Sequence, residues 1–182
     1  MKRIIILVLA FFSLMTNAQT EKVDSLQITA NNVNGFLIKE FENKSAKEIY
    51  SSLKKWTQYN INNADYATNS DIENEYLSFT INGVGEIRYK QSKQWLFKLN
   101  LYVEVRIKEN KMRLDIVVKR IAGQGHDDIS INGGMNSLFK SNGEPRNSTE
   151  TYRIDVDKSL NNFANEVFSA INGKLDYKKS DW

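Results

Sequence analysis

Cysteine is absent from this 182-residue sequence, which also contains a single proline and a single histidine. Without cysteine the chain forms no disulfide and carries no cysteine-linked lipid anchor. One histidine without cysteine also cannot supply the three or four converging ligands of a typical zinc site. Folding does not require a disulfide or a structural metal, because a chain of this size buries roughly 68–70% of the surface that its unfolded form exposes.

Long runs of like charge are also missing. The formal net charge of +3 falls to +1 if Lys2 and Arg3 are removed with an N-terminal signal. Nucleic-acid-binding domains concentrate basic residues on one face or along one helix. The sequence therefore predicts no nucleic-acid partner.

The N-terminus has the pattern of a secretory signal peptide. Lys2 and Arg3 precede an apolar run from Ile4 to Leu14, and Ala18 supplies the small residue expected at a cleavage point. This run is shorter than the ~20 residues of a membrane-spanning helix, so an uncleaved anchor is the weaker alternative. We predict a signal peptide over residues 1–18, a periplasmic or secreted protein, and no stable membrane insertion after cleavage.

The mature chain is predicted to be one domain. Residues 19–34 are polar and indicate a loosely ordered leader, residues 35–175 form the domain, and residues 176–182 form a tail. Within the domain, residues 35–42 suggest a first strand, with Phe36, Ile38 and Phe41 on its apolar side.

A helix is predicted to start at Ser45, because Ser45 and Glu48 match a capping box. Apolar residues then recur at helical spacing on one stripe: Ala46, Ile49, Tyr50, Leu53 and Trp56. The polar residues 64–74 are expected to form a connecting loop.

Alternation with a period of two begins at Glu75 and predicts strands. Asn82-Gly83 suggests a tight hairpin between residues 75–81 and 85–89. A long strand over residues 97–108 turns at Glu109-Asn110 into the next strand. A two-residue loop there would place Ile107 opposite Met112, with both apolar rows on one face.

The remainder of the chain is expected to contain one long loop and one helix. Residues 122–151 are rich in Gly, Asn and Ser, a composition typical of functional or mobile loops. Residues 155–172 carry an apolar stripe at helical spacing, with Asp155 or Asp157 as the expected N-cap.

The predicted order is strand, helix, four strands, helix. Two helices with one apolar stripe each, and strands with one apolar face, bury those surfaces by stacking together. We therefore predict an α+β fold with a single antiparallel sheet of about five strands and both helices on one face.

Four motifs together indicate a family resemblance: the signal ending Asn17-Ala18-Gln19, the Ser45–Tyr50 helix start followed by Trp56, the Gly83-Val84-Gly85 segment and the Val105–Arg113 hairpin. Apart from the signal, the resemblance covers about residues 36–121. With these motifs the chain resembles the exported bacterial domain-of-unknown-function family 4468, which has a fold like that of the TATA-box-binding protein. The resemblance implies a sheet with two helices and an envelope location, but no activity and no catalytic residues. A shared fold does not transfer DNA binding.

The polar face of the sheet is the preferred candidate site. Lys98, Tyr102, Arg106 and Arg113 are expected to line it, and aromatic rings among guanidinium groups are typical of recognition surfaces. We predict a non-enzymatic binding or accessory protein that needs no cofactor or metal. Its partner would be an envelope protein, a peptide or a glycan.

Two alternatives remain open at the level of sequence. His126, Asp127 and Asp128 bring an imidazole and two carboxylates together, which would suit a metal-assisted or acid/base hydrolase. The chain could instead be a structural subunit of an envelope assembly.

Overall fold

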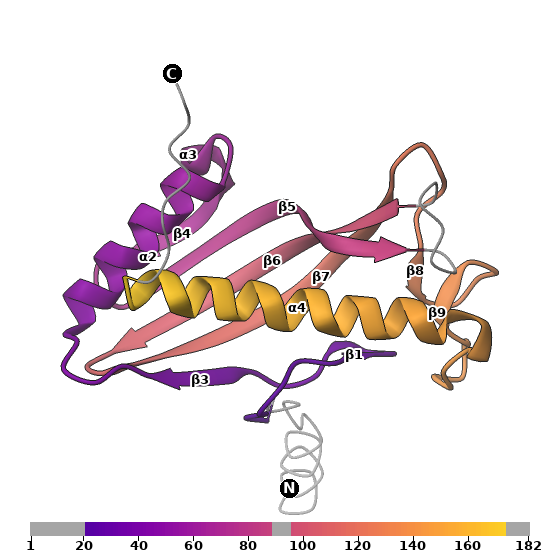
Figure 1. Cartoon of the computed structure of the whole chain (residues 1–182), viewed down its shortest axis with the longest axis horizontal. Coiled ribbons are helices and arrows are strands. Elements are labelled where there is room, and N and C mark those ends of the chain that lie inside the picture. Colours follow the sequence, from indigo (N-terminus) through magenta and orange to yellow (C-terminus); the bar gives the residue numbers. More distant parts are fainter. Residues whose placement is uncertain (1–20, 89–95, 174–182) are drawn as a thin grey trace, which may run out of the picture.

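A computed structural model describes residues 21–88 and 96–173 of the chain. The predicted signal peptide and the predicted tail lie outside these residues. The main sheet has five strands, all paired antiparallel. Their spatial order is β3 (Leu37–Glu40), β7 (Lys111–Gly123), β6 (Leu96–Lys108), β5 (Tyr76–Arg88) and β4 (Thr68–Ile72) (Figure 1).

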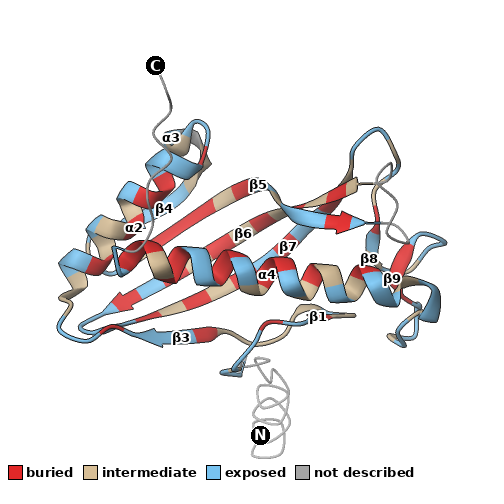
Figure 2. Cartoon of the chain, viewed as in Figure 1, coloured by how far each residue is buried: buried red, intermediate tan, exposed pale blue. Residues whose placement is uncertain are grey.

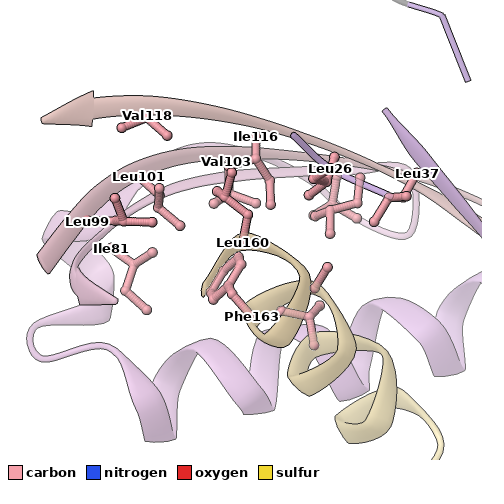
Figure 3. Packing of buried hydrophobic residues seen from close by; sticks show 14 of the residues in the cluster. Leu26, Leu37, Ile81, Leu99, Leu101, Val103, Ile116, Val118, Leu160 and Phe163 are labelled. Atoms are coloured by element: carbon pink, nitrogen blue, oxygen red, sulfur yellow. The ribbon is translucent and has the colours of Figure 1, made fainter. Parts of the chain in front are cut away.

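Both long helices cover the same face of this sheet, which confirms the predicted α+β fold (Figure 1). They are α2 (Ala46–Asn60) and α4 (Glu150–Ile171). Leu160 and Phe163 of α4 point toward the apolar side chains of the sheet (Figure 3). Trp56 of α2 is 1% exposed and packs edge-on against Phe163, with ring centroids 5.8 Å apart. The core therefore lies between one sheet face and two helices.

The start of α2 has the predicted capping box. The Glu48 amide donates to the Ser45 hydroxyl at 3.2 Å, and the Ser45 amide donates to the Glu48 carboxylate at 2.8 Å. These bonds satisfy two of the donors that a helix start leaves without backbone partners. The side-chain hydrogen bond from Ser45 also lowers the pKa of Glu48.

The pairing of β6 with β7 confirms the predicted register. Ile107 lies opposite Met112 and Val105 opposite Leu114. Asn110 of the connecting turn has a φ of +61°, the left-handed conformation that asparagine tolerates better than most residues.

The predicted hairpin at Asn82-Gly83 is wrong, because β5 continues through it as one strand. The pairing with β6 shifts between Ile81 and Val84 and again between Val84 and Ile87. Such bulges bend a strand without ending it. Gly85 lies against α4, where a Cβ would be only 2.3 Å from the Ser159 Oγ. The glycines here permit a bend and a close helix contact rather than a turn.

The expected loop over residues 64–74 is also wrong. Its residues form the short helix α3 (Ala64–Ala67) and the edge strand β4. Asp71 of β4 accepts a hydrogen bond from the Tyr50 hydroxyl at 2.7 Å and forms an ion pair with Lys54. Burial and this hydrogen bond raise the pKa of Tyr50 to about 12. Polar contacts with α2 therefore fix a strand that lacks an apolar pattern.

The apolar side predicted for the first strand is correct for Phe41 but wrong for Ile38, because Leu37 faces the core instead. Leu37 and Phe41 are buried at 8% and 2% exposure, whereas Ile38 is 38% exposed. Ile38 pairs with Arg113, so it shares the face that points away from the helices.

The predicted loose leader differs from the structure, in which residues 21–34 are docked on the domain. They include β1 (Ile28–Thr29) and β2 (Asn32–Val33), which pair with each other. The side chain of Asn161 in α4 accepts from the Leu26 amide at 3.0 Å and donates to the Leu26 carbonyl at 2.8 Å. Leu26 itself is fully buried. Side chains of α4 thus hold this segment as a strand partner would.

Residues 122–151, predicted as one long loop, contain ordered elements. β8 (Ser130–Asn132) and β9 (Ser137–Phe139) pair in parallel, and the short helix η2 (Asn147–Thr149) leads directly into α4. Helix α4 begins at Glu150, so neither Asp155 nor Asp157 is its N-cap. Arg153 instead reaches back to the carbonyls of Arg146 and Leu138 at 2.6 and 3.4 Å. Within the described part of the chain, no helix has the length and apolarity needed to cross a membrane.

Candidate functional site: the open face of the sheet

The candidate site is the sheet surface that points away from α2 and α4, here called the open face. Strand alternation places on it the side chains of Ile38, Ile72, Tyr76, Thr80, Tyr102, Glu104, Arg106, Arg113, Asp115 and Val117. Across the sheet, Ile72 pairs with Tyr76, Tyr76 with Arg106, Arg106 with Arg113, and Arg113 with Ile38. One row of residues therefore crosses all five strands.

Three of the four predicted site residues meet in one ionic network. Arg106 bonds to Asp115 and to Glu104, both at 3.1 Å. Arg113 pairs with Asp115 at 2.6 Å, and the Tyr102 hydroxyl donates to Glu104 at 3.2 Å. Like charges lie directly opposite each other in this register, but pairs along and diagonally across the strands compensate for them.

Arg113 is held more firmly than Arg106. Its guanidinium carbon lies 3.5 Å from the centre of the Phe36 ring, a stacked arrangement that favours arginine. The hydrogen bond to Asp115 raises the pKa of Arg113. Its side chain is 30% exposed, whereas that of Arg106 is 49% exposed. Arg106 is thus the more available of the two cations.

Lys98 lies apart from this network. It pairs with Ala122 near the start of β6, beyond the register shift between Asn100 and Leu101. The burial pattern alternates without a break along this part of β6, so Lys98 lies on the same side of the strand as Tyr102 but four residues away from it. The structure therefore groups Tyr102, Arg106 and Arg113 in the network and leaves Lys98 outside it.

Apolar residues on the open face are the feature that sequence reasoning missed. Val117 is 40% exposed, Ile72 is 53% exposed, and Ile38 is exposed to a similar extent. Val117 could have been found, since it interrupts the alternation between Ile116 and Val118. Ile72 could not, because its segment had no strand pattern.

The alternative site around His126 is divided by the structure. His126 and Asp127 line a hollow near the start of α4, whereas Asp128 forms an ion pair with Arg120. The hydrogen bond from Arg120 lowers the pKa of Asp128, with a further contribution from the Gly123 amide. Across residues 21–88 and 96–173, no group of three or more His, Cys, Asp or Glu side chains is placed to hold a metal ion.

Comparison with solved structures decides the fold type. A TBP-like protein from Parabacteroides distasonis superposes with a TM-score of 0.52 at 13% identity, over 75% of this chain and 90% of that one. The fold is TBP-like. A DUF4468 family protein from Bacteroides ovatus superposes with a TM-score of 0.51 at 11% identity, over 90% of this chain and 95% of that one.

The TBP-like chain thus resembles a DUF4468 family protein in fold, as the sequence motifs predicted. Neither the protein-family models nor the curated proteins gave a match. Likeness at such low identity concerns the fold alone, so any role of the open face has to be argued from its own residues.

Proposed function

We propose that this chain is an exported, non-enzymatic binding protein whose open face docks a partner protein of the cell envelope. The observation that carries the proposal is the placement of Ile38, Ile72 and Val117, three exposed apolar side chains, on one sheet face. Antiparallel sheets with one solvated face normally alternate apolar and polar residues cleanly. Burying these apolar side chains against a partner would remove them from water, which is favourable.

A protein fits this surface better than a glycan or a free peptide. The open face combines exposed aliphatic groups with tyrosine and arginine, the residue types that carry most binding energy in protein interfaces. It extends across five strands, whereas small ligands favour concave sites. The ionic network supplies charges of both signs at fixed positions and would orient the partner.

The first test uses site-specific photocrosslinking in cells that make the protein. A photoreactive residue would replace Val117 or Tyr102 on the open face, and Tyr59 or Ile154 on the helices as controls. Tyr59 and Ile154 are 61% and 57% exposed, so both controls are more accessible than the test positions, and a missing crosslink there cannot be due to burial. We expect the same envelope protein to be crosslinked from both open-face positions and from neither control.

The second test uses that partner in purified form. Val117→Asp places a carboxylate in the proposed contact and should weaken binding at least tenfold, whereas Ile154→Asp should leave it unchanged. Equal binding by the two variants, or crosslinks from the helix positions alone, would refute the role of the open face. Export is tested separately by cell fractionation and N-terminal sequencing, with Gln19 as the expected first residue of the mature chain.

A further inference from the structure

A hollow of about 900 Å³ lies between the start of β6, the start of α4 and residues 122–151. It is distinct from the open face, since Phe97 and Tyr152 in its wall are core residues that contact each other edge-on, with ring centroids 6.0 Å apart. Its volume is within the range of sites that enclose small molecules.

The floor of the hollow is apolar and firmly built. Phe97, Ile129 and Tyr152 line it and are 3%, 8% and 6% exposed. They come from β6, from the segment after β7 and from α4. The Ile129 amide donates to the Ile121 carbonyl at 3.0 Å, which ties this wall to the sheet. A ligand would therefore meet a preformed apolar surface, which lowers the entropic cost of binding.

The rim is different in chemistry. Met135 is 94% exposed, and its flexible thioether side chain is of the type that adapts to varied apolar ligands. Asp127 is a second exposed lining residue and, among the residues that the structure describes, forms no ion pair. Asp128 holds this stretch in place through its bonds to Arg120 and to the Gly123 amide. Asp127 thus presents a carboxylate to a hollow that has an apolar floor and that His126, Asn136 and Thr149 also line.

We propose that this hollow binds a small organic cation, a primary amine on an apolar stem. The ammonium group would pair with Asp127, and the stem would lie on Phe97 and Tyr152 with Met135 over it. An anion is disfavoured by the Asp127 charge. The positive end of the α4 dipole does not reverse this preference, because Glu150 in the first turn of α4 opposes it.

The test titrates the full chain with three small aromatic probes of different charge: benzylamine, benzyl alcohol and benzoate. Binding is followed by amide and methyl chemical shifts in NMR spectra. We expect saturable shifts at Met135 and Tyr152, with benzylamine binding about two- to fivefold more tightly than benzyl alcohol, the effect of one partly exposed ion pair. Benzoate should bind most weakly.

Two variants of the hollow and one control variant test which residues bind the probes. Asp127→Asn should reduce the affinity for benzylamine to that for benzyl alcohol, and Asp65→Asn, at an exposed carboxylate on α3, should not change it. Met135→Ala should weaken the binding of benzylamine and of benzyl alcohol without changing the melting temperature of the protein, because the Met135 side chain is almost fully exposed. Equal affinities for the three probes, shifts confined to other regions, or an Asp127→Asn variant that keeps the preference would overturn the proposal.

Discussion

The two faces of the central sheet are made by the same strands but are held in different ways. In β6, Leu99, Leu101, Val103 and Val105 are fully buried under the helices, and the residues between them are partly exposed (Figure 2). The covered face depends on packing, and the open face on an ionic network around Asp115. The covered side of each strand should therefore contribute most of the free energy of folding, and the open side should carry the proposed binding.

Truncating a buried residue should separate the two faces most clearly. Leu101→Ala is expected to lower the free energy of unfolding by about 2–5 kcal/mol, because it leaves a cavity in a packed core. Val117→Ala, on the open face of the neighbouring strand, should change it by less than about 0.5 kcal/mol. Urea denaturation of both variants measures the difference, and similar losses would show that the open face is also packed.

The contact between β5 and α4 tests how closely the covered face is packed. Gly85→Ala should destabilise the protein by more than about 1 kcal/mol, because φ is +65° and the new Cβ would overlap Ser159. Combining it with Ser159→Gly should recover only the part of the loss due to overlap. Thermal unfolding of the single and double variants gives both values. A neutral Gly85→Ala would contradict the observed approach of the helix.

The docked N-terminal segment extends the covered face. Asn161→Ala removes both hydrogen bonds to the Leu26 backbone and should cost about 1–3 kcal/mol, since a buried amide and carbonyl lose their partner. Asn162→Ala, at the next and exposed position, is the matched control and should have little effect. Faster hydrogen exchange at Leu26 and Ile28 in the first variant alone would confirm the contact.

Two arginines on the open face should differ in their effect. Arg106→Ala is expected to cost less than about 1 kcal/mol, as for other exposed ion pairs. Arg113→Ala should cost more, because it also removes the stacking on Phe36 and a shorter bond to Asp115. Chemical denaturation at low and high salt measures the loss of unfolding free energy in each variant. Equal losses would mean that the stacked arginine adds nothing beyond its charge.

The smallest expected effect concerns pH. Burial raises the pKa of Asp157 despite the hydrogen bond that it accepts from Ile28. A carboxyl with a raised folded-state pKa binds its proton more tightly when folded, so its stabilising contribution is present below about pH 4 and is lost as the pH rises through the folded-state value. Asp157→Asn keeps an acceptor oxygen and does not ionise. As the pH rises from about 4 through the folded-state pKa of Asp157, the variant should therefore become more stable relative to the natural chain. A constant difference from pH 3 to pH 7 would contradict this assignment.

Periodicity predicted the parts of the fold in which local and tertiary preferences agree. The capping box of α2, the β6–β7 register and the placement of both helices on one face were all correct. The failures lie where the sequence has a turn residue or a polar run but packing imposes something else. Asn82-Gly83 became a bend inside β5, and the polar residues 68–72 became an edge strand.

The candidate site was predictable only in part. Alternation alone placed Tyr102, Arg106 and Arg113 on one face, because strand geometry fixes which side chains are neighbours. Lys98 lies on the same side of β6 as Tyr102, but four residues along the strand and therefore outside the network. Ile38 and Ile72 lie in the two edge strands, β3 and β4. Long-range pairing sets the register of these strands and therefore decides that both side chains lie on the open face.

The sequence by itself determined an amphipathic sheet with two amphipathic helices, because side-chain periods of two and 3.6 residues are local properties of the backbone. Only the tertiary structure decided how residues 21–34 dock, that residues 122–151 line a hollow with β6 and α4, and which apolar residues remain exposed. Those features depend on contacts between residues far apart in the chain, and local patterns carry no record of such contacts.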